Sequence, residues 1–151
     1  MVDFDGYLKR GLLKKCEPDF RQISQQIGRA IRDMRTFRLV INKDPEWAAT
    51  IAYQSMLRVG RAILFSYGYL PADGQQHKTV VEITSGILGK KYEVISRQFD
   101  RFRKKRNAFF YESRETGNTS EAIKAADVAM KLVNAAKENA ASRNIQLDLK
   151  I

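Results

Sequence analysis

The sequence predicts a single all-α domain over residues 1–151, an up-and-down bundle of five or six helices. Two observations support this fold class. Apolar residues recur at intervals of three and four along most of the chain, and short turn signals separate the segments that show this period. A helical repeat array, the alternative, would need a recurring signature of about 30–45 residues, and the sequence holds no such repeat.

Three helices are expected in the first half of the chain. Residues 7–15 indicate a short basic helix with leucines on one side. Residues 20–41 predict a long amphipathic helix, because their apolar positions alternate between intervals of three and four. Pro45 begins a further helix that reaches about Gly68, since proline is favoured in the first turn of a helix.

A loop and two helices are expected next. Residues 69–75 contain proline and an Asp-Gly pair, which indicate a loop. Residues 78–88 predict a shorter helix, and Gly89 is placed to cap its end. Residues 92–112 predict a longer helix with a regular apolar face.

The C-terminal part predicts a turn, a last helix and a tail of two alternative forms. Residues 114–119 have no apolar period and indicate a turn. Thr119 or Ser120 can cap the last helix, which continues to about Asn139. Residues 145–151 alternate between apolar and polar, so they are either an edge strand or an extended arm.

The composition limits the compartment and the partners. A net charge of +10 favours anionic partners such as nucleic acid, nucleotides or an acidic protein. Cys16 is the only cysteine, so the chain forms no internal disulfide and suits a reducing cytoplasm. The most apolar window, residues 47–70, is interrupted by Arg58 and Arg61, which disfavours a membrane helix. We therefore expect a cytoplasmic protein with no membrane partner.

The helix expected over residues 92–112 carries an arginine on its apolar face. That face follows intervals of four and three through Ile95, Phe99, Phe102, Arg106 and Phe109. Arg106 is therefore paired inside the bundle, extends to its edge, or faces a second subunit. On a neighbouring face, Asp100 lies three residues before Arg103 and is its expected partner.

Residues 97–106 hold six cations against one acid: Arg97, Arg101, Arg103, Lys104, Lys105 and Arg106. One interpretation is a solvated basic helix face, which suits Arg101, Lys104 and Lys105. The other is an anion-binding surface edged by aromatic residues, of the kind that holds phosphates and stacks bases. A solvated face does not explain Arg106, because its neighbours on that face are Ile and Phe. We therefore predict that the six cations bind nucleic acid.

Three stretches together resemble the HEPN superfamily, over roughly residues 45–135. They are the string Arg106-Asn107-Ala108-Phe109-Phe110-Tyr111, the segment from Ala52-Tyr53 through Arg61–Phe65 to Gly68-Tyr69, and His77–Val81 after the Asp-Gly loop. The resemblance implies a helical bundle that forms a homodimer. It also implies that the arginine-bearing helices of the two subunits line a shared cleft.

The resemblance further implies a class of activity. Active members are metal-independent ribonucleases in which a histidine follows the arginine after roughly four to six residues, and many belong to toxin–antitoxin pairs or other defence systems. Members without the histidine act as RNA-binding or nucleotidyltransferase-associated partners. Carried over, Arg106 matches the family arginine, Asn107 the polar residue after it, and Tyr111 the histidine position. These three are the candidate catalytic residues.

Tyrosine at position 111 favours binding over cleavage. RNA cleavage without a metal needs a general base and a general acid, and histidine titrates at about 6.5 whereas an unperturbed tyrosine titrates at about 10. His77, the only histidine, follows a loop at the start of a helix, so we interpret it as a cap or a buried hydrogen-bonding residue. No His/Cys cluster or paired-acid motif has metal-ligand spacing, and neither a metal nor another cofactor is expected.

Three hypotheses for the function follow. The leading one is a HEPN-type dimer that binds RNA or a nucleotide, cleaves weakly or not at all, and works with a nucleotidyltransferase or antitoxin partner. The second is a metal-independent ribonuclease toxin that uses Arg106, Asn107 and Tyr111. The third is a structural dimerisation module in which Arg106 only forms hydrogen bonds between subunits.

Overall fold

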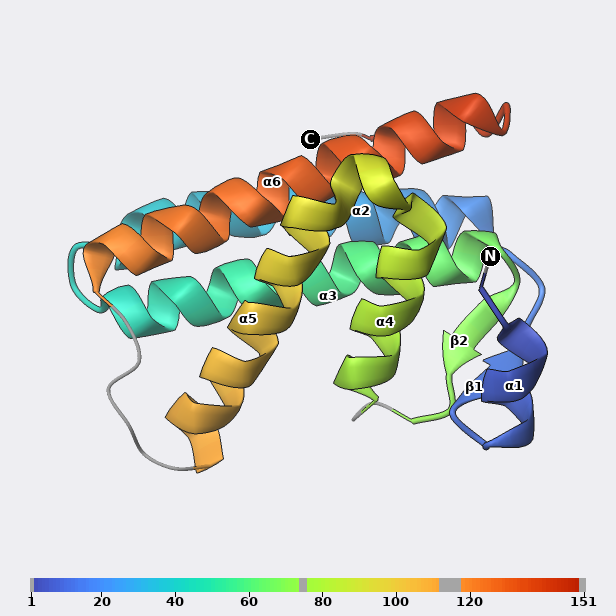
Figure 1. The fold of residues 1–151 in the computed structure, drawn as a ribbon. Coiled ribbons are helices and arrows are strands. Elements are labelled where there is room, and N and C mark those ends of the chain that lie inside the picture. The colour runs from blue at the N-terminus through green and yellow to red at the C-terminus, as the bar shows by residue number, and fades with distance from the viewer. Residues whose placement is uncertain (1, 74–75, 112–117, 150–151) are drawn as a thin grey trace.

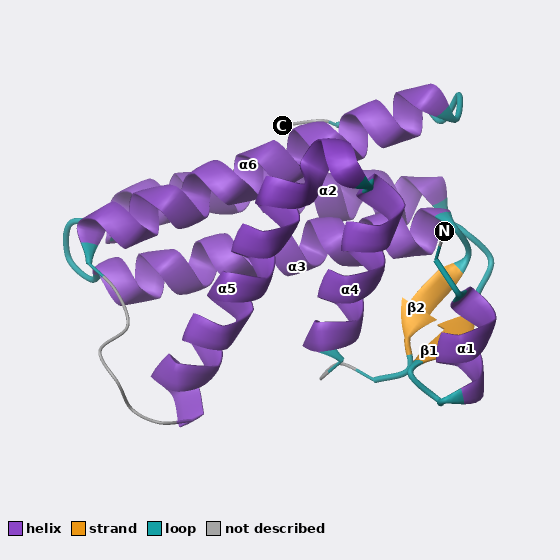
Figure 2. Ribbon diagram, in the orientation of Figure 1, coloured by secondary structure: helices purple, strands orange, loops and turns teal. Residues whose placement is uncertain are grey.

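The computed structural model describes residues 2–73, 76–111 and 118–149, and for residues 109–111 it describes the backbone alone. Within these ranges lie six α-helices, one 3-10 helix and a pair of short strands (Figures 1 and 2): α1 Phe4–Lys9, β1 Leu13–Lys15, α2 Phe20–Val40, α3 Pro45–Ser66, β2 Tyr69–Pro71, α4 His77–Leu88, η1 Lys90–Tyr92, α5 Glu93–Tyr111 and α6 Thr119–Ser142. The all-α fold class is therefore confirmed. None of the described helices has the length and apolar content needed to cross a membrane.

Helix α3 is the centre of the bundle. It packs against α2, α4, α5 and α6, and eleven of its 22 residues are buried. Figure 1 shows α2, α3 and α6 running side by side, while α4 and α5 form a hairpin that crosses α3. Because neighbours surround α3, apolar residues occur around most of its circumference, as expected for a buried helix.

Side-chain caps define where the three long helices begin. Asp19, Asp44 and Asn118 each accept hydrogen bonds from backbone N–H groups in the first turn of α2, α3 and α6. The cap of α6 is therefore Asn118, one residue before the predicted Thr119 and two before the alternative Ser120. These caps satisfy N–H groups that have no partner within the helix itself.

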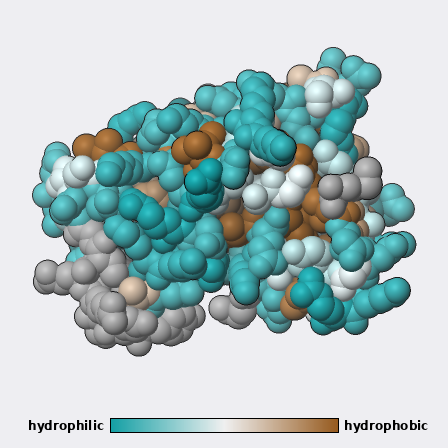
Figure 3. Space-filling model, viewed as in Figure 1, coloured by the Kyte–Doolittle hydropathy of each residue, from teal (hydrophilic) through white to brown (hydrophobic). Residues whose placement is uncertain are grey.

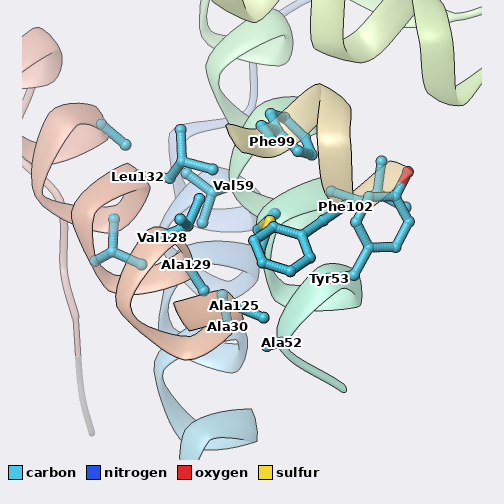
Figure 4. Packing of buried hydrophobic residues seen from close by; sticks show 14 of the residues in the cluster. Ala30, Ala52, Tyr53, Val59, Phe99, Phe102, Ala125, Val128, Ala129 and Leu132 are labelled. Atoms are coloured by element: carbon cyan, nitrogen blue, oxygen red, sulfur yellow. The ribbon is translucent and has the colours of Figure 1, made fainter. Parts of the chain in front are cut away.

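The core joins small residues of α6 to large residues of α3 and α5 (Figure 4). Ala122, Ala125 and Ala129 are fully buried, and their small size lets α6 approach α3 closely. Tyr53 and Phe99 are also buried, with their ring centroids 6.2 Å apart and tilted. Figure 3 shows that the face of the molecule that carries α4 and α5 is mostly hydrophilic.

The prediction of a helix over residues 7–15 is wrong for the second half of that segment. Helix α1 ends at Lys9, and Leu13–Lys15 form the strand β1. Between them Gly11 has a φ of +72°, a backbone conformation that glycine adopts readily and that ends the helix.

The loop predicted over residues 69–75 contains the second strand. Strand β2 pairs antiparallel with β1, with Leu13 opposite Pro71. Leu13 is buried with Leu64 and Ile83 in a small apolar cluster beside the main core. The burial of Leu13 therefore outweighs the local helical pattern of residues 7–15, a tertiary effect that the sequence pattern could not show.

The C-terminal tail is an extended arm along α2. Residues 145–149 belong to no helix or strand, and the backbone N–H of Asp148 donates to Ser24 Oγ at 3.0 Å. Leu147 and Leu149 pack against the core. The arm is thus the extended one of the two predicted forms. Of the turn predicted over residues 114–119, all but the last two residues lie outside the described ranges.

A pair of glycine substitutions tests how α4 is held. A Cβ on Gly60 would lie 2.7 Å from Val80 Cγ1 and 3.0 Å from Thr84 Oγ1, both on α4. Gly60→Ala should lower the free energy of unfolding by about 1–3 kcal/mol, because overpacking exceeds the gain in helix propensity. Urea denaturation monitored by circular dichroism measures this change.

Gly28→Ala is the matched control. Gly28 also lies inside a helix, α2, but a Cβ there would meet nothing within 4 Å. This substitution should stabilise the protein by up to about 1 kcal/mol through helix propensity alone. If Gly60→Ala is as stable as Gly28→Ala, the close approach of α4 to α3 is contradicted.

Candidate functional site

Helix α5 directs its cations to different sides. Phe99 and Phe102 are buried, as the apolar face predicts, and Arg106 lies half-buried on the same face. Arg103 is also half-buried, whereas Lys104 is exposed to solvent. The predicted nucleic-acid-binding residues therefore divide into an inner pair, Arg103 and Arg106, and an outer group.

The inner pair lies near Tyr53 of α3. Tyr53 is buried, and burial raises the pKa of its hydroxyl, an effect opposed by the positive charges of Arg106, Arg103 and Arg61. Figure 4 shows its ring beside Phe102, with the hydroxyl directed away from the alanines of α6. Tyr53 is therefore neutral at physiological pH and can donate or accept a hydrogen bond.

His77, the first residue of α4, contacts Tyr53. Its Nδ1 lies 3.3 Å from the Tyr53 hydroxyl oxygen. Burial, followed by the positive charges of Arg106, Arg61 and Arg103, lowers the pKa of His77 to about 4. The imidazole is therefore neutral at pH 7. Of the two interpretations of His77, the structure shows the hydrogen-bonding one, in a half-buried position, whereas the N-cap is Gln76. The electrostatic effect of Arg106 on His77 was not predicted.

Arg61 brings a third guanidinium from α3. It is half-buried, and burial together with the neighbouring Arg58 lowers its pKa. It also lines a groove of about 290 Å³ between α2, α3 and β2, together with Gln22, Gln26, Gln54, Arg58, Ala62, Phe65 and Leu70. We call Arg61, Arg103, Arg106, Tyr53 and His77 the arginine cluster.

Asp100 pairs with one arginine of the inner pair. Arg103 Nε donates to Asp100 Oδ1 at 2.8 Å, which confirms the predicted partner, and Lys104 Nζ lies 3.3 Å from Oδ2. Burial alone would raise the pKa of Asp100, but the hydrogen bonds from Arg103 and Lys104 outweigh it and hold the pKa below its usual range. Asp100 is therefore ionised and fixes the direction of Arg103.

Acids outside residues 97–106 compensate the outer cations. Arg97 lies 3.0 Å from Glu93, and both Arg101 and Lys105 lie 2.8 Å from Glu121 of α6. Hydrogen bonding from Lys105 is the main reason that the pKa of Glu121 is lowered. Lys105 and Arg101 thus tie α5 to α6. The surface formed by residues 97–106 is less positive than that segment of sequence indicates, because Glu93 and Glu121, which lie outside the segment, pair with its cations.

The remaining candidate residues lie at the end of α5. Asn107 is half-buried, next to Arg106 in the chain. Tyr111 is the last residue of α5, and its side chain lies outside the described part of the structure. The catalytic trio of Arg106, Asn107 and Tyr111 therefore stays a prediction. Among the described residues, no three His, Cys, Asp or Glu side chains gather to hold a metal ion.

Sequence reasoning missed the contact between Tyr53 and His77 and the effect that the charges of Arg61 and Arg106 have on both. These residues come from three helices, and no spacing rule connects residues on different helices. The one available signal was the resemblance, which drew on stretches containing Tyr53, Arg61 and His77 but gave them no common role.

Comparison with known proteins gives the family. No curated protein and no solved structure matches the chain. The HEPN domain family matches residues 13–139, most of the chain and all five members of the arginine cluster. The described helices agree with the helical domain of that family. The chain belongs to the HEPN domain family.

Proposed function

We propose that the protein binds RNA or a nucleotide through the arginine cluster. The observation that carries this proposal is the hydrogen-bonded Tyr53–His77 pair, on which the positive charges of Arg61 of α3 and of Arg103 and Arg106 of α5 all act. With Asp100 included, these groups carry three positive charges and one negative charge, and His77 is neutral. Such a site attracts an anion, and guanidinium groups match the geometry of phosphate oxygens.

The outer cations have a supporting role in this proposal. Arg97, Arg101 and Lys104 are exposed on α5 and can approach the backbone of a longer RNA. Their ion pairs are weak in solvent, so an incoming phosphate can replace the acid partner at small cost. The net charge of +10 adds a long-range attraction that speeds encounter.

We further propose that the protein acts as a homodimer within a larger system. Membership of the HEPN family supports a role beside a nucleotidyltransferase or antitoxin partner, in toxin–antitoxin or other defence systems. Light scattering at tens of micromolar should give twice the chain mass of 17.3 kDa. A monomer at that concentration would contradict the dimer and leave RNA binding to be tested separately.

A metal-independent ribonuclease is the second candidate function. The contact between His77 and Tyr53, beside the arginines, favours His77 over Tyr111 as the proton acceptor. In this reaction a nitrogen of His77 takes the proton of a ribose 2′-hydroxyl, and the 2′-oxygen attacks the adjacent phosphorus. The P–O5′ bond breaks, and the leaving oxygen takes a proton from water, giving a 2′,3′-cyclic phosphate and a 5′-hydroxyl.

Arg106 variants test the binding proposal. Arg106→Ala should weaken RNA binding by about 10–100-fold, the loss of one charge-assisted contact, while the helical content stays unchanged. Arg106→Lys should recover only part of the affinity, because lysine keeps the charge but loses the planar two-pronged geometry. Fluorescence anisotropy with a short single-stranded RNA measures affinity, and circular dichroism measures folding.

Arg35→Ala is the matched control for lost charge. Arg35 is exposed on α2, and Figure 1 shows α2 and α5 on opposite sides of α3. Arg35→Ala should change the affinity for RNA by less than about threefold, since Arg35 contributes only to the overall electrostatic field of the protein. An Arg106→Ala variant that unfolds, with a loss of about 3–5 kcal/mol, would contradict the proposal and indicate a structural arginine.

The ribonuclease candidate has its own test. If it holds, the protein should cleave RNA in the presence of excess chelator, and His77→Ala should abolish the cleavage. Tyr111→Phe should retain it, because His77 rather than Tyr111 accepts the proton. Intact RNA after prolonged incubation with the parent protein, or cleavage that survives His77→Ala, contradicts this candidate. Gel electrophoresis of end-labelled RNA distinguishes these results.

A further inference from the structure

His77 occupies an unusual position for an ionisable group, since positive charges on two neighbouring helices act on it. From α3 come Tyr53 and Arg61, and from α5 come Arg103 and Arg106, with Asp100 bound to Arg103. On α4 itself, Lys78 is exposed and lies 3.9 Å from Glu82. The Oδ2 of Asp73, in the preceding loop, accepts a hydrogen bond from Gln76.

Burial and positive charge both oppose protonation of His77. Burial is the larger cause, and the three arginines of the cluster account for the rest of the decrease in its pKa to about 4. The arginine contribution depends on what else is present. An anion placed among the three guanidinium groups would offset their charge and would attract a proton to the imidazole.

The hydrogen bond with Tyr53 suits both protonation states of His77. In the neutral imidazole one ring nitrogen donates and the other accepts, so the Tyr53 hydroxyl can serve either role toward Nδ1. In the imidazolium both nitrogens donate. Nδ1–H would then donate to the neutral Tyr53 hydroxyl, and Nε2–H, on the opposite edge of the ring, would be available to a bound oxygen.

The N-terminus of α4 also favours an anion near His77. Helix α4 has twelve residues, and the side chain of its N-cap residue, Gln76, accepts no hydrogen bond from the backbone N–H groups of the first turn. The N–H groups of that turn carry a partial positive charge, which favours an anion near His77. The helix end adds to the three guanidinium groups and would not define a site without them.

We propose that the arginine cluster is the subsite for a phosphate group of the ligand, and that His77 takes up a proton when the phosphate binds. The inference rests on the proposed function and specifies which part of the ligand the cluster recognises. Because the bound state holds an extra proton, affinity rises as the pH falls. The increase is up to tenfold per pH unit between the pKa of His77 in the complex and its pKa in the free protein.

The single histidine makes the test direct. In the ¹³C-labelled protein one imidazole Cε1–H signal reports on His77, because the chain holds no other histidine. Its titration is followed from pH 8 to about pH 4 in the free protein, with adenosine, with adenosine 5′-monophosphate, and with a dinucleotide that has one internal phosphodiester. We expect the midpoint to rise by at least about one pH unit with a phosphate-bearing ligand and to stay unchanged with adenosine.

The two phosphate ligands identify the source of the phosphate. A rise with the monophosphate alone supports a terminal phosphate, and a rise with the dinucleotide supports an internal phosphodiester. If RNA binds to the protein but leaves the His77 titration unchanged, the inference is overturned and the proposed function still stands. If no RNA binds at low salt, the proposed function fails instead.

An arginine variant tests the geometry without a ligand. In free Arg106→Ala the midpoint of His77 should rise, because one positive charge near the imidazole is lost. Arg35→Ala, with the same loss of charge on α2, should leave the midpoint unchanged. Arg106→Gln serves if the alanine variant does not fold. Equal midpoints in the parent and a folded Arg106 variant overturn the inference.

Discussion

Helix α4 approaches α3 at Gly60, where the missing side chain gives room for Val80 and Thr84. His77 lies one turn before Val80, and Tyr53 lies two turns before Gly60. The close approach of the two helices therefore brings His77 to the Tyr53 hydroxyl. Phe99 packs on the same region of α3, so α5 is held there too and carries Arg103 and Arg106 toward the same point. The arginine cluster depends on this helix packing.

Two kinds of cation follow from this arrangement. The outer cations of α5 are compensated by Glu93, Asp100 and Glu121 and contribute to solubility, to helix contacts and to a general field. The inner arginines share a partly desolvated space with a buried tyrosine and a neutral histidine. Electrostatic interactions are stronger there than in bulk solvent, because water screens them less. Under the proposed function, the outer cations would attract an anion over a long range and the inner arginines would recognise it.

The helices could largely be predicted from the sequence, because the apolar period and the turn residues act locally. The long segment from Phe20 and the start at Pro45 agree with the structure to within a residue or two. The strand pair could not be predicted, since each strand has three residues and is fixed by the burial of Leu13 rather than by a period. In the same way, Asp100 could be predicted as the partner of Arg103, because both lie on α5. Glu121 of α6 could not be predicted as the partner of Arg101 and Lys105, because it lies on another helix.

For the candidate site, the sequence identified Arg106 by its position on an apolar face but did not identify its surroundings. His77 lies far from Arg106 along the chain, and the packing of α4 against α5 lets the charge of Arg106 act on His77. The catalytic role of Tyr111 stays a prediction, because its side chain lies outside the described part of the structure.

The most direct measurement is a double-mutant cycle between Arg61 and Arg106 for RNA affinity. The two arginines come from different helices, and the account assigns them to one phosphate. The loss in the double variant should therefore differ from the sum of the two single losses by more than about 0.5 kcal/mol. Losses that add within that margin, with both single variants folded, would contradict a shared anion site.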